Sequence, residues 1–229
     1  MVRFKPILDY SWNGIPLEQF LENHKRWVET KGLDGERAVL KGARLREVNL
    51  EYADLRAAIL PEVDLGDANL LNVTLRGANV KKSLLSRAYM RGAMLRYADM
   101  SEVDLWEANL EDTDLRDVDF REARLTGANL TGANLRCANL EGADLRQVNL
   151  ELACLVEANL TGADLREANV MWTNLKNANL TAANLAGVFN VSVEQMSHVH
   201  TLYEAKIDDI LFNEIKKNYP HLLDLPERK

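Results

Sequence analysis

The sequence predicts a solenoid, in which short coils of chain stack along one axis. Three observations predict this fold class. A large apolar residue stands at every fifth position from Leu40 to Leu185, a small residue lies two positions before it, and the residue between them is usually polar. A period of five fits neither the roughly 3.6-residue period of a helix nor the roughly two-residue period of a strand. The chain must therefore turn a corner in every repeat.

The large apolar residue, called the centre below, builds the core of this solenoid. It is leucine except at Val80, Met90, Met100, Phe120 and Val170. Four corners close a coil of about 20 residues, and coils that contact only their neighbours bury all the centres when they stack. The small residue must also point inward, because four leucines per layer leave little room at the packing density of protein interiors. Phe120 stands above Met100, so we expect the core to widen there or small neighbours to make room.

The repeat is plainest in residues 126–145, which read T-G-A-N-L-T-G-A-N-L-R-C-A-N-L-E-G-A-D-L. This A-(N/D)-L-x-x pattern resembles that of the pentapeptide-repeat proteins, and the resemblance covers residues 36–187. It implies a β solenoid, namely a right-handed quadrilateral β-helix of about 7.5 coils. The functions of that family are diverse, so the resemblance implies a fold and no particular task.

Residues 1–35 precede the repeat and are predicted to form an N-terminal helical cap. Pro16 suits the first position of a helix and Gly32 suits its end. Between them, one face of the helix carries Leu17, Phe20, Leu21, His24, Trp27 and Val28. A helix over the first coil would shield an open edge that can otherwise pair with another chain. Docking of a partner on this helix is the alternative.

Residues 188–229 follow the repeat and are predicted to form a C-terminal helical cap. Ser192 and Gln195 have the spacing of a capping box at the start of a short helix. Residues 205–207, Ala-Lys-Ile, have the order of one degenerate repeat. We expect Asp208 to cap a second helix that ends before Pro220. The chain is expected to be a monomer, or an end-to-end homodimer as in some family members with a helical tail.

Composition excludes several functional classes. The net charge of -7 over 229 residues and the isoelectric point near 5.2 argue against direct binding of nucleic acid. Two cysteines, Cys137 and Cys154, are too few for a disulfide framework, and the first ten residues do not resemble a secretory signal. No apolar run has the length of a membrane span. We therefore expect a bacterial, cytoplasmic protein that does not bind a membrane.

The first candidate binding feature is a set of arginines that stack on one face, each directly after a centre. This Arg column consists of Arg56, Arg76, Arg96, Arg116 and Arg136, and Val156 and Lys176 continue it. Stacked guanidinium groups repel unless they are paired or stacked on planar partners. Carboxylates on the same face supply part of this pairing: Asp54, Asp114, Asp117 and Glu157. The Arg column is either a solvated, ion-paired face or a site for an anion or an acidic partner.

The second candidate feature is an apolar set where polar residues are the rule. It consists of Leu71, Leu84, Tyr89, Met94, Tyr97 and Trp106. Exposed aromatic residues and methionine beside arginine are typical of protein-binding surfaces. The alternative is that residues 1–12 or another terminal segment cover this set. A smaller group near the far end is expected to lie under the C-terminal segment: Leu152, Cys154, Val156, Met171 and Trp172.

Two further surface patterns have simpler interpretations. Residues 99–122 hold ten carboxylates, but this stretch is little longer than one coil and forms a belt around the rod. Some pentapeptide-repeat proteins protect DNA gyrase by resembling duplex DNA, which needs acidic stripes along the axis and not a belt. Stacked asparagines are expected to bond to turns or to each other between coils: Asn49, Asn69, Asn109, Asn129, Asn149 and Asn169.

No catalytic, cofactor or metal site is expected. The histidines lie in the terminal segments without the spacing of a metal site: His24, His198, His200 and His221. No phosphate-binding loop or nucleophile motif occurs. The sequence therefore predicts a non-enzymatic protein-binding or scaffold protein with an unidentified protein partner, bound through the Arg column and the apolar set. The alternative function is that of a DNA-mimicking protein that binds and protects DNA gyrase.

Overall fold

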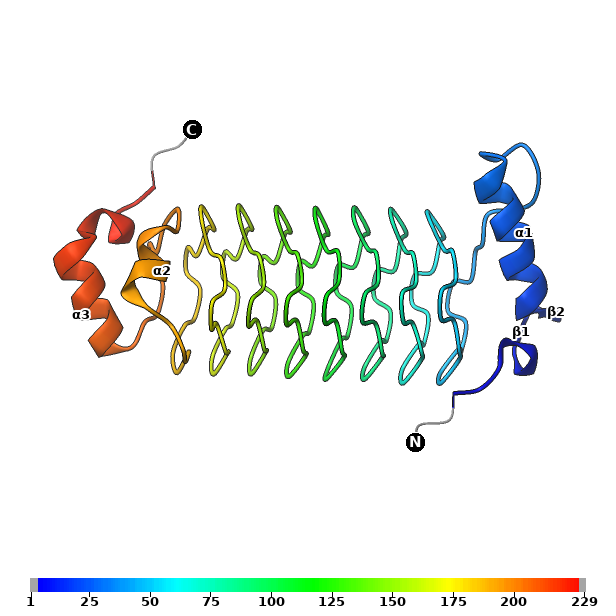
Figure 1. Cartoon of the computed structure of the whole chain (residues 1–229), viewed down its shortest axis with the longest axis horizontal. Helices are drawn as coiled ribbons and strands as arrows, with labels where there is room; N and C mark the ends of the chain where they lie inside the picture. Colours follow the sequence, from blue (N-terminus) through cyan, green and yellow to red (C-terminus); the bar gives the residue numbers. More distant parts are fainter. Residues whose placement is uncertain (1–3, 227–229) are drawn as a thin grey trace.

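The computed structural model describes residues 4–226, which form a straight rod of stacked coils with a helical segment at each end (Figure 1). Coils are joined by parallel bridges between residues twenty apart, from Val39 with Ile59 to Asn169 with Phe189. The predicted solenoid and its coil length are confirmed. Each bridge is isolated, because a corner in every repeat leaves one bridging residue on each side of a coil. Named strands in the described chain are therefore confined to β1 (Ser11–Trp12) and β2 (Ile15–Pro16), which pair antiparallel.

Four of the five backbone amides in a repeat bond in a fixed pattern. The amides of Leu130 and Gly132 donate to the following coil at 2.8 and 2.9 Å, and that of Asn129 donates to the preceding coil at 2.9 Å. The amide of Ala133 closes the turn onto the Leu130 carbonyl at 3.0 Å. The backbone thus satisfies its own hydrogen bonds between coils. The residue two positions after each centre has positive φ, as at Gly132 (φ 68), which favours glycine.

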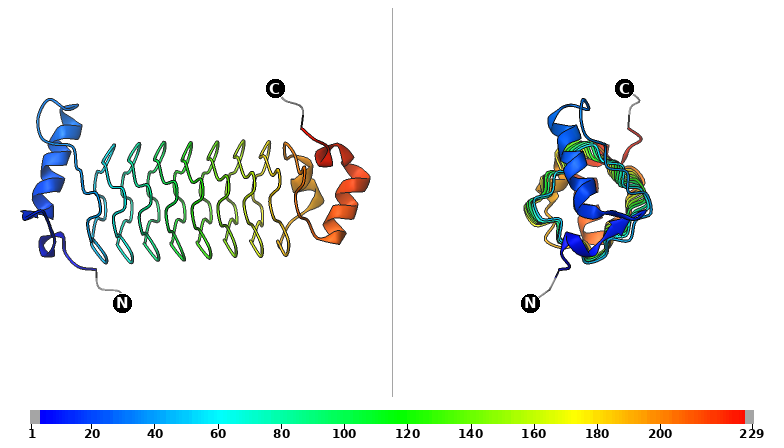
Figure 2. Two further views of the ribbon diagram at one scale, coloured as in Figure 1. Left: turned by 180° about the vertical axis from the view of Figure 1, so that it is seen from behind. Right: turned by 90° about the vertical axis from the view of Figure 1, so that its right-hand side faces the viewer.

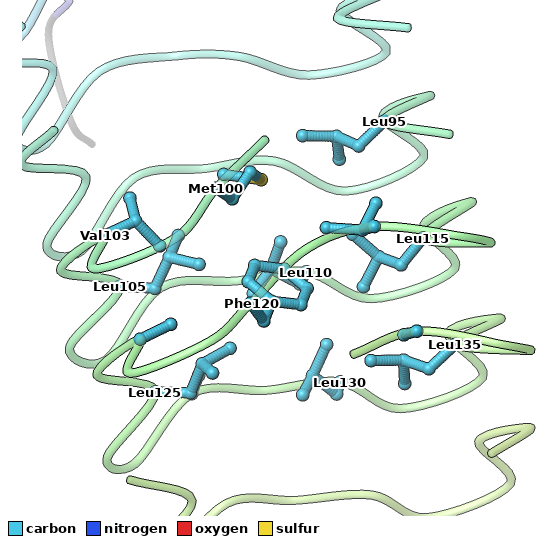
Figure 3. Packing of buried hydrophobic residues seen from close by; sticks show 14 of the residues in the cluster. Leu95, Met100, Val103, Leu105, Leu110, Leu115, Phe120, Leu125, Leu130 and Leu135 are labelled. Atoms are coloured by element: carbon cyan, nitrogen blue, oxygen red, sulfur yellow. The ribbon is translucent and has the colours of Figure 1, made fainter. Parts of the chain in front are cut away.

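The centres and the small residues fill the axis of the rod. Figure 3 shows the centres pointing inward from the sides of successive coils, with Phe120 among leucines. Phe120 is fully buried, and its amide donates to the next coil at 2.7 Å, as does that of Leu110. The larger ring therefore fits without lengthening the hydrogen bonds between coils.

The N-terminal segment lies across one end of the rod (Figures 1 and 2). A short 3-10 helix, η1 (Ile7–Asp9), leads through β1 and β2 to the helix α1 (Leu17–Glu29). Leu17 and His24 are the buried residues of α1. Pro16 immediately precedes the helix and is not its first residue, contrary to the expectation. Lys5 bridges Val48 in parallel, so the segment before η1 adds one rung to the side of the first coil.

The C-terminal segment closes the other end with α2 (Val193–Ser197), α3 (Asp209–Asn218) and the 3-10 helix η2 (Pro220–Leu223). The capping box of Ser192 and Gln195 is present as predicted. Lys206 bridges Asn184, twenty-two residues away, so the degenerate repeat does form a rung. Asp208 precedes α3, but its carboxylate accepts from the Gly187 amide at 2.9 Å and does not cap the helix, which corrects that expectation. No helix in residues 4–226 is both long and apolar enough to cross a bilayer.

Candidate binding surface

The Arg column lies on one side of the coils, and most of its members are ion-paired. Arg56 and Arg116 each bond the aspartate two positions earlier, with shortest nitrogen–oxygen distances of 2.6 Å to Asp54 and to Asp114. Arg96 reaches Asp117 at 3.1 Å. Arg136 pairs with Glu157 at 3.1 Å. The four carboxylates expected to compensate this face all do so.

Asp54 and Asp114 are held in their charged form, because the pKa of each carboxyl is lowered. The hydrogen bonds from the Arg116 side chain lower the pKa of Asp114, against the opposing effect of burial. The side-chain bond to Asp114 raises the pKa of Arg116. Such fork-shaped pairs are geometrically specific, but at this exposure they add little to stability. Their main consequence is that Arg56 and Arg116 are already occupied.

A groove of about 590 Å³ runs along this face across four coils. Its lining consists of Tyr52, Asp54, Arg56, Thr74, Arg76, Met94, Arg96, Asp114 and Arg116. Four members of the Arg column thus share the groove with Met94, whereas Arg136 lies outside its lining. Met94 is 48% exposed, so the groove presents an apolar side chain among charged groups.

Tyr97 stands beside the groove and contacts two of its arginines. The guanidinium carbon of Arg96 lies 4.5 Å from the centre of the Tyr97 ring, and that of Arg76 lies 5.8 Å from it. Cation–π contacts of this kind hold a guanidinium against a planar surface. In residues 4–226 no carboxylate forms an ion pair with Arg76, unlike its neighbours Arg56, Arg96 and Arg116.

The apolar set does not form one surface, contrary to the expectation. Leu84, Tyr89 and Met94 precede successive centres, and because the chain turns a corner between them, they face three different sides of the rod. Met94 and Tyr97 belong to the Arg column's side. Leu71 is half-buried and lies two residues after Asn69, on the side of Tyr89.

The other aromatic members of the set have contacts of their own. Trp106 lies between two arginines, with the guanidinium carbons of Arg87 and Arg124 at 5.7 and 5.8 Å from its ring. The ring of Phe4 meets that of Tyr89 edge-on, with ring centres 5.4 Å apart. The N-terminal segment therefore contacts Tyr89, as the covering alternative expects, and leaves Met94 and Tyr97 about half exposed.

The smaller group near the far end is not covered as a whole. Val156 is buried, but Trp172 is 68% exposed and Leu152 is 57% exposed. The C-terminal helices lie across the end of the rod and do not fold back along its side (Figure 2). Trp172 lines an open groove of about 650 Å³ against residues 190–198. The expectation that the C-terminal segment covers Trp172 and Leu152 is wrong.

The acidic belt is largely neutralised by cations. Seven of its ten carboxylates form ion pairs within the described chain: Glu102, Asp104, Glu111, Asp112, Asp114, Asp117 and Asp119. The partners come from neighbouring coils or from the same turn, for example Arg124 with Asp104 at 3.4 Å. The belt is therefore a network of paired charges more than a negative surface.

The asparagine column is structural, as predicted. The side-chain amide of Asn69 donates to Asn49 at 2.9 Å, and that of Asn169 donates to Asn149 at 2.9 Å. The side-chain oxygen of Asn69 also accepts from the amide of Leu71 at 3.2 Å. Bonds of the second kind tie a turn to its own repeat, and bonds of the first kind tie it to the adjacent coil.

The remaining titratable groups of the described chain do not gather into a metal site. Within residues 4–226 no three His, Cys, Asp or Glu side chains are placed to hold a metal ion. His24 is buried, accepts from the Ala38 amide through Nδ1 at 3.0 Å, and stacks on Trp27. Burial lowers the pKa of His24. Cys137 and Cys154 are free thiols, and burial raises the pKa of Cys137.

Sequence reasoning missed two residues of the groove, Tyr52 and Thr74, whereas Asp54 and Asp114 were expected on this face as compensating charges. The available signal was the column two positions before the arginines. It reads Asp54, Thr74, Met94, Asp114, so the pairing carboxylate is absent in the two middle coils.

Comparison with known proteins gives one family and several solved structures. The family model for pentapeptide repeats matches residues 38–77, 75–112, 113–151 and 153–189. HetL, involved in heterocyst differentiation regulation in the cyanobacterium Nostoc sp. strain PCC 7120, is 26% identical over 80% of this chain and 92% of its own, with a TM-score of 0.36. Rfr23 from the cyanobacterium Cyanothece 51142 is 25% identical over 82% and 99%, with a TM-score of 0.28. A trypsin-treated variant of QnrB1, a plasmid-mediated fluoroquinolone resistance protein, is 18% identical over 85% and 94%, with a TM-score of 0.48. No match was found among curated proteins.

Proposed function

Because the chain belongs to the pentapeptide-repeat family, whose members fold as right-handed β-helices, we propose that it is a non-enzymatic protein-binding or scaffold protein. The observation that carries this proposal is the groove on the Arg column's side. It combines arginine, tyrosine and methionine, which are enriched where proteins bind one another. The interior of the rod is filled by centres and small residues, so a binding site must lie on its exterior.

The rigidity of the rod supports a binding role. Each side chain of the groove sits at a fixed place in a turn whose backbone is bonded to the coils on both sides. Such a surface loses little conformational entropy when a partner binds, which favours affinity. We further propose that α1 and α3 with η2 shield the two ends of a β-helix of about 7.5 coils, in a cytoplasmic monomer or end-to-end dimer.

The alternative function, binding of DNA gyrase by resemblance to duplex DNA, has less support. Mimicry of DNA needs unpaired negative charge repeated along the axis, because the phosphate charge dominates what DNA-binding proteins recognise. The acidic belt is mostly ion-paired, and the stripe that runs along the axis is the Arg column, whose carboxylates are themselves paired with its arginines.

The test is affinity capture from lysate with wild-type protein and two variants. Tyr97→Ala removes the ring beside the groove, whereas Trp172→Ala removes a more exposed ring from the far end. A partner lost with Tyr97→Ala and kept with Trp172→Ala supports the proposal. Loss with both variants or with neither would place binding elsewhere, and recovery of gyrase subunits would favour the alternative.

A further inference from the structure

In the first and last coils of the groove an aspartate forms an ion pair with the arginine. The two middle coils lack this aspartate. Thr74 and Met94 stand where Asp54 and Asp114 stand in the flanking coils. In those flanking coils the Nε of arginine bonds one carboxylate oxygen and Nη2 the other, at 2.9 and 2.6 Å for Arg56. The arginines of the middle coils therefore cannot form the same local pair.

The two arginines of the middle coils differ in the partners that their guanidinium groups contact. Arg96 turns to Asp117, through one hydrogen bond of 3.1 Å from Nε. Arg76 is exposed and has no ion pair in the described part of the chain. The Tyr97 ring lies next to both guanidinium groups. Arg76 is thus positioned by an aromatic contact while its hydrogen-bond donors stay available.

The charges of the groove leave an excess of one. Four guanidinium groups line it, those of the Arg column from Arg56 to Arg116, against two carboxylates, Asp54 and Asp114. A third carboxylate, that of Asp117, lies outside the lining and pairs with Arg96. The remaining positive charge belongs to Arg76. At physiological ionic strength the net negative charge of the rest of the rod is screened over about 8 Å. The groove is therefore matched to a ligand with one negative charge.

We propose that this groove binds an extended segment of a partner protein by placing one aspartate or glutamate carboxylate on Arg76, with an apolar residue two positions away against Met94 and Tyr97. The inference rests on the proposed protein-binding function and names the chemistry of the partner. A carboxylate matches the single charge and the fork of the guanidinium. A phosphate group brings about 1.5–2 negative charges at neutral pH, which exceeds the one that is free.

The length of the groove fits such a segment. Its four coils lie about 4.8 Å apart, which gives about 14 Å from first to last, and an extended chain advances about 3.3 Å per residue. About four residues therefore span the groove, with side chains pointing alternately toward and away from it. Met94 and Tyr97 both lie one coil beyond Arg76. One acidic residue and one apolar residue two positions away, in a four- or five-residue stretch, therefore satisfy the charge and the apolar contacts together.

The decisive variant is Thr74→Asp, which places a carboxylate beside Arg76 as Asp54 stands beside Arg56. The fold already tolerates aspartates stacked in adjacent coils, as at Asp99 with Asp119. The matched control is Asn134→Asp, which adds the same carboxylate beside Arg136, in the same column and outside the groove. Both variants change the net charge equally, so any difference between them reports the site and not general repulsion.

The experiment selects random peptides displayed on phage against the wild-type protein and measures the selected peptide by fluorescence anisotropy. We expect enrichment of one acidic residue with an apolar residue two positions from it. Thr74→Asp should weaken binding of that peptide about 10-fold or more, since a hydrogen-bonded ion pair is lost. Asn134→Asp should leave binding within about 2-fold, and changing the acidic residue of the peptide to its amide should match the effect of Thr74→Asp.

Three outcomes would overturn the inference. Selected peptides without a carboxylate that bind the groove would leave the proposed function standing and remove its acidic partner. Equal weakening by Thr74→Asp and Asn134→Asp would show that binding depends on overall charge alone. If no peptide is enriched and affinity capture also fails to recover a partner that depends on Tyr97, both the inference and the proposed function fail.

Discussion

Replacing Leu17 by alanine is expected to undock α1 from the end of the rod. Leu17 is the first residue of α1 and is fully buried, and its amide donates to the Tyr10 carbonyl at 2.9 Å. Truncating a buried leucine costs about 2–5 kcal/mol, because transferred area is lost and a cavity remains. At the lower limit this raises the population of undocked helix about 30-fold.

The effect should be local, since each coil contacts only its neighbours. Amide hydrogen exchange followed by NMR provides the assay. The amide of Ala38 donates to the side chain of His24 in α1, and that of Leu40 donates to Ile59 in the next coil at 2.9 Å. Both should exchange at least about 10-fold faster in Leu17→Ala, whereas the Leu130 amide in mid-rod should be unchanged.

The control is Leu33→Ala, which removes the same atoms from a side chain that is 92% exposed in the same segment. It should leave the exchange of Ala38 and Leu40 as in the wild type. Unchanged protection in Leu17→Ala would refute a stabilising contact between α1 and the first coil. Equal acceleration at Leu130 would refute local opening and show that the rod unfolds as one unit.

Three further predictions concern single side chains. Burial lowers the pKa of His24, so the unfolded chain binds a proton more readily than the folded chain. Docking of α1 should therefore weaken as pH falls below about 6.5. Amide hydrogen exchange of the residues around His24 should depend on pH in the wild type, and this dependence should be absent in His24→Gln. The side-chain bond from Arg146, against the opposing effect of burial, holds the pKa of Asp144 at about 2, so its stabilising contribution is present above the unfolded value and lost as pH falls toward 2. An NMR titration of that carboxyl in Arg146→Gln should show a pKa near the ordinary value of about 3.9, and a value unchanged from the wild type would contradict the pairing. Tyr97→Gly should unfold in denaturant no more easily than the wild type. The backbone φ is 64 at this position, so glycine relieves about 1–2 kcal/mol of backbone strain, which offsets the loss of a half-exposed ring. Clear destabilisation would show that the ring packs more tightly than its contacts indicate.

The fold was predictable because the five-residue period that determines it can be read directly along the sequence. A period of five forces corners, and stacking at a spacing of twenty follows from closing four of them, as the bridge between Asn109 and Asn129 shows. The capping box at Ser192 was equally local and was read from two residues. The rung formed by Lys5 was not predictable, because bridging Val48 requires the chain to pass across the end of the rod before α1 begins.

The candidate site was predictable only in part. The arginines were visible as a column, and their aspartate partners followed from the shared side. The apolar set was misread as one surface because its members are close in sequence, whereas each repeat moves the next side chain to another side of the rod. Trp172 was expected to be covered because the tail is near in sequence, but the tail crosses the end of the rod. Proximity along a solenoid follows multiples of twenty and not the residue number.

The hydrogen bonds between coils also give the chain a direction of assembly. The amide of Leu130 donates to Asn149 in a coil that is synthesised later, while that of Asn129 donates to Ala108 in an earlier one. During translation every newly completed coil is therefore a template for the next coil. Its forward-pointing backbone amides remain without acceptors until that next coil has been synthesised. The tail ends this series, since Leu185 donates to Lys206 at 2.7 Å. A chain released early at any coil would keep such an open edge and could recruit a second nascent chain to complete it.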